Sequence, residues 1–120
     1  MIEEYQGYFD RVVDEVLKVG FKLTQNEDYS ALFERKDGWK LLLEGERHYR
    51  PLIDIEIIHP KGGDGLSLRI LMNTYQIIEG TDLPPPSLEN QLSFLTDNFD
   101  SWLINVKKYE LTYIELNEQQ

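Results

Sequence analysis

The stretch YSALFERKDGWKLLLE (residues 29–44) decides the fold. Apolar and polar residues alternate on both sides of Asp37-Gly38, which is the pattern of a β-hairpin. Two loop lengths can join its strands, and they differ by one residue in register. Because side chains alternate in direction along a strand, this register decides which residues face the core.

A two-residue loop would bring Glu34 onto an apolar face, beside Leu41. A three-residue loop, Lys36-Asp37-Gly38, pairs Glu34 with Lys40 instead. One face of the hairpin is then uniformly apolar and the other carries a pair of opposite charges, which favours this register. We therefore predict the three-residue loop with Gly38 left-handed. The other pairs in this register are Phe33 with Leu41 and Ala31 with Leu43.

Two further strands are predicted on either side of this hairpin. The stretch FKLTQ (21–25) precedes it, with Phe21 and Leu23 facing inward. The stretch LIDIEII (52–58) follows it, with three isoleucines alternating with Asp54 and Glu56. Alternation turns Ile53, Ile55 and Ile57 toward the core and the two carboxylates away from it. The result is a four-stranded antiparallel meander.

Helices are predicted before and after the sheet. Apolar residues recur at spacings of three and four over residues 2–19, and Gly20 is placed to end that helix. Residues 66–79 carry both a strand-like and a helix-like pattern, of which we favour the helix. Ser87 is a candidate N-cap for a helix whose apolar side extends to Val106. The tail, residues 109–120, either extends this helix or forms a short strand.

These elements predict one α+β domain spanning residues 1–120. Its N-terminal helix is followed by the four-stranded meander and by two C-terminal helices packed on one face of the sheet. A length of 120 residues suits a single domain.

The charge balance limits the classes of partner. Twenty-two acidic residues outnumber twelve basic ones, for a formal net charge of −10. Such a field repels phosphate, so we expect no nucleic-acid partner, whereas it speeds encounter with a basic protein. It also confers solubility. Apolar runs are too short to span a bilayer, and cysteine is absent. From the acidic start we expect no cleaved signal peptide, and we therefore expect no membrane partner and a cytoplasmic location.

No pattern in the sequence names a reaction. His48 and His59 are predicted at opposite ends of the fourth strand, too far apart to hold one metal ion. Asp54 and Glu56 share an open sheet face, without the burial that separates the pKa values of catalytic carboxylates. We therefore expect no catalytic residue, metal site or cofactor. The enzymatic alternative is a small hydrolase that uses Asp54, Glu56 and His59.

The exposed sheet face is the predicted partner-binding site. An apolar cluster rimmed by charge is typical of an interaction surface. Here acidic side chains surround leucines, of which Leu32 and Leu52 lie beside the central one. The predicted partner-binding residues are Glu34, Leu42, Glu44, Asp54 and Glu56.

The order of YFDRVVDEVLKVGFKL, the meander ending in LIDIEIIHP, SLRILMNTY and LENQLSFLTDNFDSWL resembles small bacterial α+β proteins of the immunity type, which accompany polymorphic or contact-dependent toxins. This resemblance implies a non-catalytic cytosolic protein that blocks a toxin, often a basic nuclease, by covering its active site.

The stretches VLKVGFKL and LLLEGERHYRPLIDIEI also resemble class I type III secretion chaperones, which are acidic dimers that hold an unfolded effector segment. Such a chaperone normally has a helix between its third and fourth strands, for which GERHYR is too short. The oligomeric state stays open between monomer and homodimer, since a sheet edge or Tyr109 and Tyr113 could mediate self-association.

Overall fold

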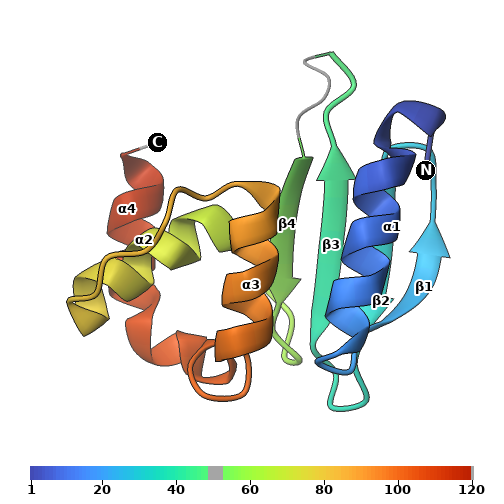
Figure 1. Ribbon diagram of the computed structural model, residues 1–120. Coiled ribbons are helices and arrows are strands. Elements are labelled where there is room, and N and C mark those ends of the chain that lie inside the picture. The colour runs from blue at the N-terminus through green and yellow to red at the C-terminus, as the bar shows by residue number, and fades with distance from the viewer. Residues whose placement is uncertain (49–52, 120) are drawn as a thin grey trace. The chain divides into compact units, whose positions relative to one another are not determined.

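The computed structural model describes residues 1–48 and 53–119, which form an α+β structure (Figure 1). The chain divides into two compact units, Met1–Ser67 and Leu68–Gln120. The first contains a helix and an antiparallel sheet, and the second contains the C-terminal helices. The prediction of one domain over residues 1–120 stays a prediction.

The sheet of Met1–Ser67 has five strands in the order of the chain, β1-β2-β3-β4-β5. All neighbouring strands pair antiparallel, so the predicted meander is confirmed. The strands are β1 (Lys22–Asn26), β2 (Ser30–Glu34), β3 (Lys40–Gly45), β4 (Ile53–Ile58) and β5 (Leu66–Ser67).

The predicted hairpin register is confirmed. Glu34 pairs with Lys40, Phe33 with Leu41 and Ala31 with Leu43. Gly38 has a φ of 96°, the left-handed conformation that the three-residue loop needs. The apolar side chains of these pairs are buried, as are Ile55 and Ile57 on β4; the four are Phe33, Leu41, Ala31 and Leu43. One face of the sheet is therefore the core face, as alternation predicts.

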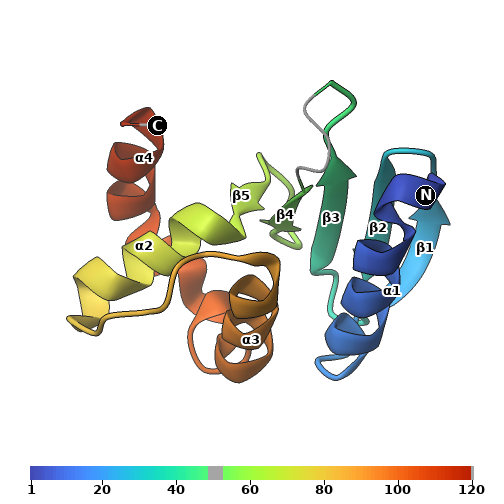
Figure 2. The same ribbon diagram turned by 45° about the horizontal axis from the view of Figure 1, so that its top comes forward.

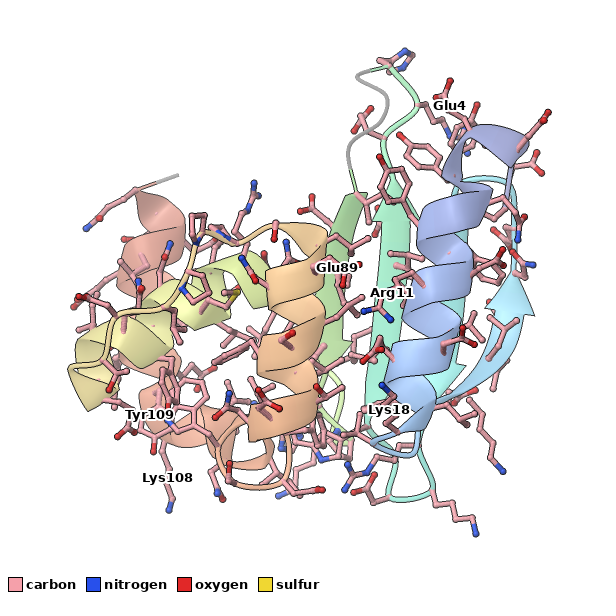
Figure 3. The ribbon with its side chains drawn as sticks, in the orientation of Figure 1. Glu4, Arg11, Lys18, Glu89, Lys108 and Tyr109 are labelled. Carbon is pink, nitrogen blue, oxygen red and sulfur yellow. The ribbon has the colours of Figure 1, made fainter. Side chains whose placement is uncertain are left out.

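Helix α1 (Glu3–Leu17) lies along the core face of the sheet (Figure 1). Its Phe9 ring lies 6.5 Å from the Phe33 ring, and its Tyr5 is fully buried against β3. Gly20 follows the helix with a φ of 89° and ends it as predicted. Along α1, Arg11 and Lys18, both labelled in Figure 3, bind Glu15 at 2.6 and 2.9 Å.

Strand β1 forms one edge of the sheet, and its pairing is irregular. The register with β2 shifts between Leu23 and Gln25, which indicates a β-bulge. Leu23 was predicted to face inward, but it is 41% exposed. It pairs with buried Phe33, so it lies on the expected face, and its position on an edge strand leaves it partly open to water.

The prediction of four strands was wrong by one. Residues 66–67 form β5 beside β4, with Leu66 opposite Ile57 and Ser67 opposite Glu56 (Figure 2). A two-residue strand has too few positions for a periodic pattern, so its pairing with β4 alone defines it. Helix α2 (Leu68–Glu79) begins at the next residue. The helix favoured for residues 66–79 is thus confirmed from Leu68 onward, and only residues 66–67 form a strand.

The prediction of two C-terminal helices was also wrong. The second unit contains α2, α3 (Leu88–Asn98), the 3₁₀ helix η1 (Leu103–Tyr109) and α4 (Glu110–Glu118). Ser87 caps α3 as predicted, accepting a hydrogen bond from the backbone N–H of Asn90 at 3.2 Å. The helix expected to reach Val106 ends at Asn98; residues 99–102 form a turn, and Trp102, with φ −135° and ψ −52°, precedes η1. Whether these helices pack on the sheet face stays a prediction.

An aromatic cluster joins three of these segments. Tyr75 of α2 meets Phe94 of α3 and Trp102 edge-on, at 5.4 and 5.1 Å between ring centroids. Tyr109 stacks flat on Trp102 at 4.6 Å. The indole N–H of Trp102 donates to Oε1 of Glu79 at 3.0 Å. Aromatic contacts of this kind add to the stability that burial alone provides.

Candidate functional site

The predicted partner-binding residues lie together on the second face of the sheet. Glu34 on β2, Leu42 and Glu44 on β3, and Asp54 and Glu56 on β4 alternate with the buried residues of the core face. Each of the five retains contact with water, and Glu44 is exposed. Since α1 lies on the opposite face, we call this surface the open face. Leu52, also predicted here, lies outside the described residues.

Carboxylates concentrate on the β3–β4 pair. Glu44 lies directly opposite Asp54, and Leu42 directly opposite Glu56. Like charges opposite each other on neighbouring strands are destabilising. In the described part of the chain the Glu44 carboxylate has neither an ion pair nor a hydrogen bond. The open face thus carries adjacent negative charge.

Glu56 also experiences repulsion from neighbouring carboxylates. Partial burial raises the pKa of its carboxyl group above the ordinary value, and the nearby Glu44, Asp54 and Asp64 carboxylates raise that pKa further. Part of this burial comes from Gly65, where a Cβ would lie 2.8 Å from the Glu56 Oε1. A neighbouring cation would favour the charged form of Glu56.

Glu34 differs from the other carboxylates of the open face. Its Oε1 lies 3.6 Å from Nζ of Lys40, the cross-strand partner that the register predicted. Both side chains are more than 40% exposed, so the pair is weak. Glu34 is on the predicted surface, but its charge is already balanced locally.

A hollow of about 710 Å³ lies at the end of the open face. It is bounded by the turn between β1 and β2 and by the chain that follows β3. Two of the predicted residues, Leu42 and Glu44, line it. The other lining residues are Glu27, Asp28, Tyr29, Ser30, Gly45, Glu46, Arg47 and His48.

Backbone contacts fix the walls of this hollow. The N–H of Gly45 donates to the carbonyl of Tyr29 at 2.8 Å, which ties β3 to the β1–β2 turn. The hydroxyl of the buried Tyr5 donates to the carbonyl of Glu46 at 2.6 Å. The approach of Tyr5 requires a glycine at position 45, since a Cβ there would lie 2.7 Å from the ring.

Sequence reasoning missed two of the residues that shape the hollow. The guanidinium of Arg47 lies over the Tyr29 ring, 4.9 Å from its centroid, in a cation–π contact. The edge of Tyr29 also meets Tyr5, at 6.5 Å. Neither Tyr29 nor Arg47 belongs to a motif, so only the pairing of distant segments brings them together.

The two histidines have separate environments. His48 is exposed at the hollow, and its backbone N–H donates to the Glu46 carboxylate at 3.2 Å. His59 packs edge-on against Trp39 at 4.8 Å, and its Nδ1 accepts from the N–H of Lys61. Within residues 1–48 and 53–119, no group of three or more His, Cys, Asp or Glu side chains could hold a metal ion.

Tyr109 and Tyr113, which the sequence offered for self-association, occupy packed positions, as do Trp39 and Trp102. Trp39, Trp102 and Tyr113 are all at most 6% exposed. Tyr109 is half-buried on Trp102. Their packing accounts for these residues without a ligand.

None of the helices in the described ranges combines the length and the apolar content that a bilayer span requires. Comparison of the chain with protein-family models, with curated proteins and with solved structures returned no match.

Proposed function

We propose that this protein is a non-catalytic binding module whose open face docks a basic protein partner. The observation that carries the proposal is the pairing of Glu44 with Asp54 across β3 and β4, beside Glu56. A sequence selected only for stability would place a cation at one of these positions, because opposite-charge pairs stabilise a sheet and like-charge pairs do not. A cationic partner would relieve this repulsion on binding.

Leu42 supplies the apolar contact that charge alone cannot provide. It lies between the carboxylates, half-exposed, with Leu32 as its partner on β2. Charge gives encounter rate and orientation, whereas desolvated apolar contact slows dissociation. Among binding modules, an immunity-type protein that covers a basic toxin combines these two requirements, and we propose it as the class.

The test uses two mirror variants, Asp54→Lys and Glu44→Lys. Each converts the like-charge pair into an opposite-charge pair, so each variant should fold at least as stably as the original protein. Both should nevertheless lose partner binding, since both remove negative charge from the open face. This opposition between stability and binding separates a docking role from a structural one.

Partners are first recovered from the host with the original protein, and association rates are then measured with the purified partner. We expect both variants to associate several-fold more slowly at low salt and to show a weaker salt dependence. Glu115→Lys on α4 is the matched control, because it makes the same charge change at an exposed position in the other unit. Equal association rates for Asp54→Lys and the original protein would refute the open face as the docking surface.

A further inference from the structure

The hollow at the end of the open face has a chemistry of its own. Its volume of about 710 Å³ falls in the range of small-ligand sites, roughly 300–1,000 Å³. Such sites are usually apolar, but four of the residues that line this one are acidic: Glu27, Asp28, Glu44 and Glu46. The hydroxyl of Ser30 approaches Glu27 at 3.5 Å, so one wall is already ordered. The lining therefore suits a cation with hydrogen-bond donors.

A cation of the protein itself lies beside this site. Arg47 lies with its guanidinium over the Tyr29 ring, at the rim of the hollow. Arg47 and Tyr29 are both held by β3 and its neighbours, yet the Arg47 side chain is exposed. An exposed cation–π contact is weak, about 0.5–1 kcal/mol, and can be exchanged for an equivalent one. The position of Arg47 thus identifies the kind of group that this wall accepts.

We propose that the hollow is an arginine-binding site, in which a guanidinium from the basic partner replaces that of Arg47 on Tyr29. This inference rests on the proposed function, because it supplies the residue type that the partner presents. A guanidinium is preferred to an ammonium because its planar group stacks on an aromatic face. Two of its N–H groups can also donate to the two oxygens of one carboxylate. Glu44, which lines the hollow and has no ion pair in the described part of the chain, is a candidate acceptor.

Arg47 is then an internal competitor, and its removal should strengthen binding. The probe is the capped tripeptide acetyl-Gly-Arg-Gly-amide, with the Lys and citrulline tripeptides as comparisons. Backbone amide shifts of Tyr29, Glu44 and His48 are followed by NMR during titration. We expect the Arg peptide to move these three signals at millimolar concentration, the Lys peptide to act more weakly, and the neutral citrulline peptide to have no effect.

Three variants of the intact chain test the competition. Arg47→Ala should bind the Arg peptide about two- to fivefold more tightly, the factor that corresponds to one exposed cation–π contact. Lys36→Ala is the matched control, because it also removes one exposed positive charge, but from the loop at the far end of β2 and β3. Glu44→Gln, at an exposed position, should weaken binding without disturbing the core.

Equal affinity for the Arg and citrulline peptides would overturn the inference. So would an affinity of Arg47→Ala no greater than that of Lys36→Ala, or shifts confined to residues away from the hollow. If the hollow fails these tests while Asp54→Lys still slows association with the partner, the arginine site is wrong and the docking face stands. If the Arg peptide binds the hollow while Asp54→Lys has no effect, the docking function is wrong and the arginine site stands.

Discussion

Replacing Gly45 by alanine should destabilise Met1–Ser67, although alanine is ordinarily the better residue inside a strand. The new Cβ would lie 2.7 Å from Cε2 and 2.8 Å from Cδ2 of Tyr5. Ordinary carbon–carbon contacts are about 3.5–4.0 Å, so the ring must retreat by roughly 1 Å. Tyr5 is fully buried, and its hydroxyl is bonded to the Glu46 carbonyl, so this ring cannot move freely.

Three contributions set the expected magnitude. Overpacking a buried site costs about 1–3 kcal/mol. Weakening the bond from Tyr5 to Glu46 costs about 1 kcal/mol more. Removing a glycine from a strand returns about 0.5–1 kcal/mol. We therefore expect Gly45→Ala to lower the free energy of unfolding by about 2 kcal/mol, measured by urea denaturation followed by circular dichroism.

Two comparisons test this explanation. Gly7→Ala in α1 makes the same substitution where nothing lies within 4 Å, so it should stabilise the protein by about 0.5–1 kcal/mol. In a Tyr5→Leu background the clash disappears, so adding Gly45→Ala should stabilise the protein by about 0.5–1 kcal/mol. A cost of Gly45→Ala that is the same with tyrosine or leucine at position 5 would refute the reasoning, as would a neutral effect in the original protein.

Three further substitutions have expected outcomes. Glu56→Gln should stabilise the protein by a few tenths of a kcal/mol at pH 7. The raised pKa of Glu56 means that its ionisation costs stability as the pH rises through the folded-state value, so the advantage should vanish below about pH 4 in urea denaturation across pH. Ser87→Ala removes the N-cap of α3 and should cost about 1 kcal/mol in thermal unfolding. Trp102→Phe loses the bond to Glu79 and stacking area on Tyr109, so amide hydrogen exchange should accelerate in α2 and η1, whereas an unchanged rate would contradict this packing.

The sequence predicted the sheet register because two independent signals agreed there. Apolar alternation and the Glu34–Lys40 pair both select the three-residue loop, and the structure has that loop. The faces of β4 followed from the same alternation, so the sheet positions of the five predicted site residues were predictable from local pattern. Their binding role stays a prediction.

Other features depend on contacts that no local pattern records. β5 exists because residues 66–67 pair with β4. The end of α3 at Asn98 could not be predicted from the sequence, because the helical spacing of apolar residues continues through both α3 and η1 up to Val106. The hollow was missed because its aromatic wall and its cation, Tyr29 and Arg47, are eighteen positions apart and meet only when β3 pairs with β2.

Both rims of the sheet discourage strand addition. The bulge in β1 between Leu23 and Gln25 interrupts the regular ladder of amide and carbonyl groups that an incoming backbone would need, and β5 on the opposite rim offers only two residues. An extended peptide therefore finds no long regular template on either terminal strand, β1 or β5. Concentrated samples of this protein should therefore resist the edge-to-edge polymerisation that leads to fibrils.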